Sequence, residues 1–152
     1  MNLVSKVFEH LGDRTLVTAE SLTGGGIGMT ITSVAGSSKV YKGGVISYTN
    51  EVKEQVLGVP HEMLEKIGAV SAPVAEAMAA GVRKLLKADA AVSVTGLAGP
   101  DGDEFGNPVG TVFIGYSDKN GTVSRELHFQ GNRGAVRQQT IIEALQLILV
   151  HT

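Results

Sequence analysis

The 152-residue chain contains no cysteine and no tryptophan, and only 5% of its residues are aromatic. Without cysteine it can form no disulfide framework, no thiolate nucleophile and no thiolate metal site. Its four histidines, His10, His61, His128 and His151, are scattered, and no two of them have the spacing of metal ligands. We therefore expect neither a histidine zinc site nor serine–histidine catalysis, and we predict no metal or other cofactor.

Charge and hydrophobicity exclude two further classes of protein. The net charge is −2, so composition gives no reason to expect binding to nucleic acid or to an anionic membrane. No apolar run is long enough to span a bilayer, and the amphipathic N-terminal segment is unlike a signal peptide. We expect a cytoplasmic protein. The length and the 43% hydrophobic content predict one domain over residues 1–152.

Extended and helical patterns alternate along the chain, and the hydrophobic periodicity of each segment predicts a strand or a helix. Strands are expected at residues 14–20, 43–49, 90–96, 111–117 and 122–129. Helices are expected at residues 1–13, 50–59, 61–68, 71–88 and 132–151, with another after the glycine-rich turn that opens 23–36. The pair Asn120–Gly121 predicts a hairpin between the last two strands. The predicted fold is an α/β three-layer α/β/α sandwich with a mixed, mostly parallel sheet and one antiparallel hairpin.

The turn after the first predicted strand is rich in polar residues and glycine. Ligands of open α/β sheets gather where strands end and helices begin, and Ser21 lies at such a junction. We expect Thr23 to cap a helix that opens with Gly24, Gly25 and Gly26. Their backbone N–H groups would then be available to an anion or to a developing oxyanion. The simpler alternative is a tight turn whose glycines only satisfy unusual dihedral angles.

Known motifs do not explain this turn. It lacks the lysine and the spacing of a phosphate-binding loop, and it does not fit the dinucleotide pattern GxGxxG. Ser21 is not part of a GxSxG elbow, and no serine has a lysine three residues later. A base for a serine nucleophile must therefore come from elsewhere in the chain.

A lysine at the next junction could supply that base. Residues 45–53 are typical of a strand that runs into a helix, with Asn50 as the N-cap and Lys53 in the first turn. A cation is disfavoured there by the helix dipole, and a lysine with a lowered pKa can act as a base. Tyr48 could relay a proton between Lys53 and Ser21. The plainer interpretations are a solvated lysine and a half-buried strand tyrosine.

Several segments occur in the order expected of one protein family. They are AESLTGG, AGSS, GGVISYTNEVKEQVLGV, GAVS, VTGLAGPDG, PVGTVFIG and GNRGAVRQQ. In these segments the chain resembles the competence-damage-inducible protein C-terminal domain family, whose enzymatic members are nicotinamide mononucleotide deamidases. The resemblance implies hydrolysis of nicotinamide mononucleotide to nicotinate mononucleotide and ammonia in pyridine nucleotide salvage. The alternative is a non-catalytic nucleotide-binding or regulatory module linked to competence or the DNA-damage response.

The resemblance also implies site residues. The family's catalytic serine, tyrosine and lysine fall on Ser21, Tyr48 and Lys53, and the expected reaction passes through a serine acyl-enzyme. Two positions depart from the family pattern, Leu22 for a usual cysteine and Asn132 for a usual aspartate, and neither is expected to disrupt the site. Together with the turn described above, the predicted substrate-binding residues are Thr23, Gly24, Gly25, Ser38, Thr95, Gly96, Arg133 and Arg137.

The expected partner is a small-molecule substrate that carries a phosphate. Arg133 and Arg137 lie four residues apart near the start of the last predicted helix, and a guanidinium fits phosphate oxygens well. One of the two should bind the 5′-phosphate, with hydroxyl contacts from Ser38 or Thr95, and we favour Arg133 because it is nearer the helix end. We also expect a homo-oligomer, with a dimer favoured because dimers are the commonest assembly.

Overall fold

The computed structural model describes residues 2–152. Its strands form one five-stranded sheet in the order β2-β1-β3-β4-β5. The strands are β1 (Leu16–Glu20), β2 (Tyr41–Ile46), β3 (Ala90–Gly96), β4 (Thr111–Asp118) and β5 (Gly121–His128). Strand β1 pairs in parallel with β2 and β3, whereas β4 is antiparallel to both β3 and β5. Because β4 alone runs against the others, the predicted mixed, mostly parallel sheet with one hairpin is confirmed.

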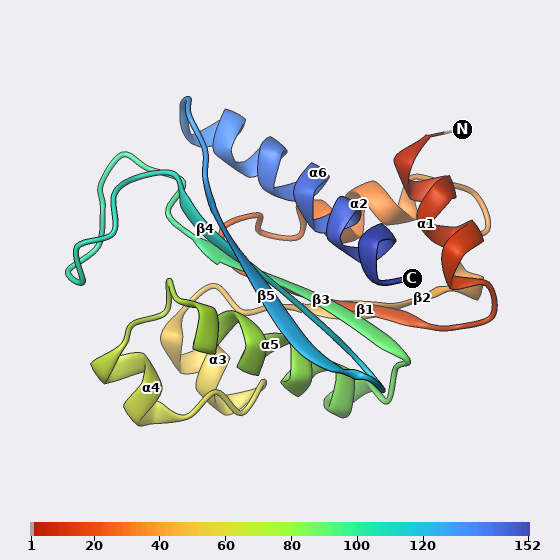
Figure 1. The fold of residues 1–152 in the computed structure, drawn as a ribbon, viewed down its shortest axis with the longest axis horizontal. Coiled ribbons are helices and arrows are strands. Elements are labelled where there is room, and N and C mark those ends of the chain that lie inside the picture. The colour runs from red at the N-terminus through yellow and green to blue at the C-terminus, as the bar shows by residue number, and fades with distance from the viewer. Residues whose placement is uncertain (1) are drawn as a thin grey trace.

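Helices cover both faces of this sheet, which confirms the predicted three-layer sandwich (Figure 1). On one face lie α1 (Leu3–Leu11), α2 (Gly26–Thr32) and α6 (Arg133–His151). On the other lie α3 (Asn50–Gln55), α4 (His61–Lys66) and α5 (Ala72–Leu86), and a 3₁₀ turn, η1 (Ser37–Lys39), leads into β2. Within residues 2–152, no helix combines the length and the apolar character needed to cross a membrane.

The interior strand β1 is buried on both faces, and its side chains alternate between two apolar clusters. Leu16 packs in the cluster that includes α1, α2 and α6, and Val17 and Ala19 pack in the cluster that includes α5. This alternation continues to the end of the strand. Glu20 therefore points toward α2, and the following residue, Ser21, points toward the α3 layer.

Two local predictions are wrong by one residue. The cap of α3 is Thr49, whose side-chain oxygen accepts the backbone N–H of Val52 at 3.4 Å, so the predicted cap, Asn50, is the first helical residue. In the hairpin, Asp118 pairs with Gly121, so the two turn residues are Lys119 and Asn120. A threonine and an asparagine both cap well, and sequence alone did not distinguish them.

Candidate active site

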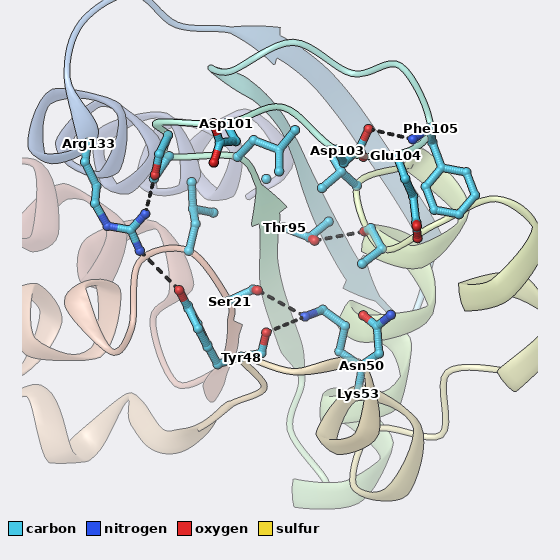
Figure 2. Close-up of a pocket in the computed structure, with 17 residues that line it drawn as sticks. Ser21, Tyr48, Asn50, Lys53, Thr95, Asp101, Asp103, Glu104, Phe105 and Arg133 are labelled. Carbon is cyan, nitrogen blue, oxygen red and sulfur yellow. Dashed lines mark hydrogen bonds between the residues drawn. The ribbon is translucent and has the colours of Figure 1, made fainter.

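A cavity of about 480 Å³ lies at the carboxyl ends of β1 and β3 and at the start of α3 (Figure 2). The loop between β3 and β4 and the start of α6 complete its walls. It brings together segments that are far apart in the chain, as expected for the carboxyl edge of an open α/β sheet. Of the predicted site residues, the structure places six on its walls, which are Ser21, Tyr48, Lys53, Thr95, Gly96 and Arg133.

Ser21 and Lys53 are in direct contact in this cavity. Lys53 Nζ lies 3.0 Å from Ser21 Oγ (Figure 2). The two side chains come from neighbouring strand–helix junctions, Ser21 from the end of β1 and Lys53 from α3, which follows β2. Lys53 is 1% exposed, so the interpretation of a solvated surface lysine is wrong. Fixed contact between a hydroxyl and a buried amine is the arrangement that a nucleophile and its base require.

Burial changes the chemistry of Lys53. It lowers the pKa of the Lys53 amine to about 8, because a charged ammonium is costly away from water. No carboxylate among residues 2–152 forms an ion pair with this lysine. We had expected the positive end of α3 to lower the pKa, but burial is the cause, and Lys53 is the fourth residue of the helix. A substantial fraction of Lys53 is therefore neutral at slightly alkaline pH.

Two backbone carbonyls orient this amine. Lys53 Nζ lies 2.7 Å from the Ser47 oxygen and 3.3 Å from the Tyr48 oxygen. A carbonyl oxygen can only accept, so each takes one N–H of the amine. A neutral amine has two N–H groups and one lone pair, so with both N–H groups on these carbonyls the lone pair is left for the Ser21 hydroxyl. The main chain of 47–48 thus holds the Lys53 amine against Ser21 Oγ.

Tyr48 lines the cavity, but its hydroxyl does not lie between the serine and the lysine. It accepts a hydrogen bond from Arg133 at 3.1 Å (Figure 2). A second nitrogen of Arg133 donates to the Gly99 oxygen at 2.6 Å. The expected proton relay through Tyr48 is not needed, because Ser21 and Lys53 touch directly. Tyr48 and Arg133 instead form a polar wall, and both side chains are accessible to solvent.

Two of the three glycine N–H groups that we expected to be free are engaged within the turn. Gly24 N–H donates to the Ser21 oxygen at 3.0 Å, and Gly26 N–H donates to the Thr23 oxygen at 2.9 Å. The N-cap of α2 is Gly25, with no side-chain cap, so the prediction that Thr23 caps this helix is wrong. Gly24 and Gly25 instead have positive φ angles, +58° and +104°, as the simpler alternative required.

A residue that the sequence analysis did not identify, Glu20, occupies the position at the start of α2 where an anionic ligand was expected. The Glu20 carboxylate accepts the backbone N–H groups of Ile27 at 2.8 Å and Gly28 at 3.0 Å. It also accepts the Thr23 hydroxyl at 2.6 Å. Glu20 is 2% exposed, and its position as the last residue of a buried strand was the available signal. The first turn of α2 therefore binds a carboxylate of its own chain.

The other predicted residues divide between the cavity and elsewhere. Thr95 is on the wall and donates its hydroxyl to the Ala69 oxygen at 2.8 Å. Arg137 donates to the Thr23 oxygen at 3.2 Å and is not on the wall, which leaves Arg133 as the guanidinium that faces the cavity. Ser38 is exposed in η1, before the amino end of β2, so it is at the opposite edge of the sheet.

The loop between β3 and β4 supplies wall residues that the sequence did not single out. They are Leu97, Ala98, Gly99, Asp101, Asp103, Glu104 and Phe105. Asp103 organises the loop, since its carboxylate accepts the backbone N–H groups of Phe105 and Asn107 at 3.0 and 2.9 Å. Across residues 2–152, no group of three or more histidine, aspartate and glutamate side chains is placed to hold a metal ion.

Several solved structures have the same fold and a similar sequence. The competence damage-inducible protein A of Klebsiella pneumoniae superposes with a TM-score of 0.95 at 33% identity, covering 97% of this chain and 93% of that one. The competence/damage inducible protein of Agrobacterium tumefaciens gives 0.93 at 36% identity, with 97% and 92% covered. Both are similar to the present chain over nearly their whole length.

Curated relatives are also similar in sequence to this chain, over a part of their own length. A putative competence-damage inducible protein of Acetivibrio thermocellus is 47% identical over 134 residues, which are 88% of this chain and 32% of that protein. A CinA-like protein of Geobacter sulfurreducens is 47% identical over 142 residues, 93% of this chain and 34% of the relative. The chain thus spans about a third of the length of these relatives. The CinA C-terminal domain profile matches residues 2–151. The chain belongs to the CinA C-terminal domain family.

Proposed function

We propose that the protein is an amidohydrolase that converts nicotinamide mononucleotide and water to nicotinate mononucleotide and ammonia. The observation that carries the proposal is the contact of 3.0 Å between Ser21 and a buried Lys53 whose pKa is lowered to about 8. The family resemblance supplies the substrate, and Arg133 supplies a cation on the same cavity wall for its phosphate.

The proposed reaction has two halves. Ser21 Oγ attacks the carboxamide carbon while its proton passes to neutral Lys53 Nζ. The protonated lysine then gives this proton to the amide nitrogen. The C–N bond breaks, ammonia is released, and an acyl ester remains on Ser21. In the second half, Lys53 takes a proton from water, which attacks the ester carbon; the C–Oγ bond breaks, Lys53 returns the proton to Ser21 Oγ, and the acid is released. Since Gly24 N–H is already engaged, Leu22 N–H, next to Ser21 on the cavity wall, is the proposed donor to the oxyanion.

A binding module without chemistry is the competing function. The names of the relatives refer to competence damage and do not themselves specify an activity. However, a buried lysine without an ion-pair partner lowers the stability of a protein, and binding alone does not require it. Its presence beside a serine favours catalysis.

The deciding experiment is an assay of purified protein with nicotinamide mononucleotide. Ammonia release should match the formation of nicotinate mononucleotide one to one. Protein that binds the mononucleotide without releasing ammonia would instead support the binding module, and the proposed hydrolysis would have to be abandoned.

The rate should depend on pH through Lys53. Because the neutral amine is the base, kcat/KM should rise with pH along a limb with its midpoint near 8 and level off above it. An unburied lysine would place that midpoint at about 10.4. The measurement is kcat/KM across pH 6 to 10. A rate that stays constant over this range would show that Lys53 does not act as the base.

Arg133 should determine the affinity for the phosphate. Replacing it with methionine should raise KM for nicotinamide mononucleotide by about 10- to 100-fold, as expected for loss of a charge-assisted hydrogen bond. Turnover of nicotinamide riboside, which lacks the phosphate, should hardly change. Arg125→Met is the matched control, since Arg125 lies on β5 and pairs with Glu143 at 3.8 Å. Equal losses on both substrates would mean that Arg133 supports the loop through Gly99 instead.

A further inference from the structure

The carboxylate of Glu20 is fully engaged beside the proposed nucleophile. Glu20 ends β1 and directly precedes Ser21, and its side chain is 2% exposed. Both carboxylate oxygens accept hydrogen bonds: Oε1 from the Thr23 hydroxyl and from Ile27 N–H, and Oε2 from Gly28 N–H, at 2.6 to 3.0 Å. The carboxylate thus joins the strand before Ser21 to the helix after it, so both ends of the turn that carries the serine are fixed.

The backbone of the same residue is linked to the base. The Glu20 carbonyl oxygen accepts the Ser47 N–H at 2.7 Å and the Ser47 hydroxyl at 3.1 Å. The Ser47 carbonyl oxygen in turn accepts from Lys53 Nζ at 2.7 Å. Ser47 is fully buried. Glu20 is therefore covalently joined to Ser21 and connected to Lys53 through one intervening residue.

We propose that Glu20 is a positioning residue, whose buried carboxylate fixes the turn at 20–28 and so keeps Ser21 Oγ in contact with Lys53 Nζ. This inference rests on the proposed function only for the identity of the substrate. The contact between Ser21 and Lys53 is present in the structure whatever the substrate is. The carboxylate touches neither Ser21 Oγ nor the cavity, so it acts only through the turn. A displacement of a reacting atom by about 1 Å can lower a rate by about 100-fold.

To position the turn, Glu20 must accept hydrogen bonds at both of its carboxylate oxygens. In Glu20→Gln, one oxygen is replaced by an NH₂ group that can donate but cannot accept. Whichever way the amide turns, at least one of the three donors loses its acceptor, and an N–H of α2 or the Thr23 hydroxyl then faces another donor. The turn must shift to relieve this, although the walls that bind the substrate, which come from other segments, stay in place.

The first test is the kinetics of Glu20→Gln. We expect kcat for nicotinamide mononucleotide to fall by about 100-fold, with KM within about two-fold of wild type. The midpoint of the pH limb should stay unchanged, because Lys53 keeps its contacts with Ser47. Glu51→Gln, which alters an exposed glutamate on α3, is the matched control and should behave like wild type. A kcat of Glu20→Gln equal to that of wild type would overturn the proposal.

The second test does not depend on the natural substrate. An alkyl fluorophosphonate reacts when an activated serine attacks phosphorus: an O–P bond forms, the P–F bond breaks, fluoride leaves, and Lys53 takes the proton. Mass spectrometry should locate the adduct on Ser21, and labelling of Glu20→Gln should be about 100-fold slower. If wild type is labelled but does not hydrolyse the mononucleotide, the proposed function fails and this comparison still decides the role of Glu20. A wild-type protein that is not labelled would overturn both proposals.

A milder variant keeps the test decisive if Glu20→Gln does not fold. Thr23→Val removes one of the three hydrogen bonds with little change in side-chain shape. We expect its labelling at Ser21 to be slower by about 10-fold, in line with a hydrogen bond to a charged group. Labelling at the wild-type rate in a folded Thr23→Val protein would show that the Glu20 carboxylate does not position the serine.

Discussion

Purified Ser21→Ala protein is expected to release ammonia from nicotinamide mononucleotide at least about 10³-fold more slowly than wild type, because it lacks the attacking oxygen. Lys53→Ala should lose activity to a similar extent, because no other base within residues 2–152 contacts Ser21 Oγ. The measurement is ammonia release under single-turnover and steady-state conditions. Both residues act in one step, so the double variant should be little worse than either single variant.

Lys53→Arg separates the two roles that a cation at this position could play. Arginine remains charged at every pH of interest and cannot accept the serine proton. We therefore expect it to be as inactive as Lys53→Ala. The control is Ser33→Ala, which removes an exposed hydroxyl at the end of α2. An active Lys53→Arg protein would show that positive charge alone suffices, and the base would have to be sought elsewhere.

The second large effect concerns stability. Folding lowers the pKa of Lys53 from 10.5 to about 8, so between these values the unfolded chain binds more protons than the folded one. Raising the pH through this window must therefore stabilise the folded state. Compared with Lys53→Met, the free energy of unfolding of wild type should gain about 3 kcal/mol between pH 7 and pH 10.5, at about 1.4 kcal/mol for each unit of pKa difference.

Urea denaturation of both proteins at several pH values would measure this difference. The Lys66→Met variant, which removes an exposed lysine on α4, serves as the control. Its difference from wild type should stay nearly constant over the same range. If the Lys53→Met difference is equally constant, the amine is not desolvated in the folded protein, and the proposed base loses its main support.

The sequence predicted the layers of the fold because most elements have a clear hydrophobic period. Burial of β3, for example, follows from its uninterrupted run of small and apolar residues. The junctions that carry Ser21 and Lys53 also followed from the alternation of strands and helices. The depth at which Lys53 is buried could not be predicted, since it depends on the loop at 69–70 and on β3, far away in the chain.

Errors in the predicted site have a common cause. Glycine-rich turns and capping residues indicate where a helix begins, but not which polar group occupies its first turn. Glu20 occupies it here, and its role depends on a strand direction and a helix position that only the folded chain defines. Ser38 was expected in the site by resemblance to a family motif, but it lies in η1, before the amino end of β2 and therefore opposite the cavity. Local sequence patterns thus predict which residue types a site contains better than they predict which residues contact one another in the fold.

Tyr48 contacts both halves of the cavity, and this has a consequence for the choice of substrate. Its backbone oxygen accepts from Lys53 and its hydroxyl from Arg133, so one tyrosine bridges the gap between base and guanidinium. Base and guanidinium are therefore connected through a single residue and two hydrogen bonds. On the proposed function, this spacing favours substrates whose anionic group reaches Arg133 while their carboxamide lies beside Ser21.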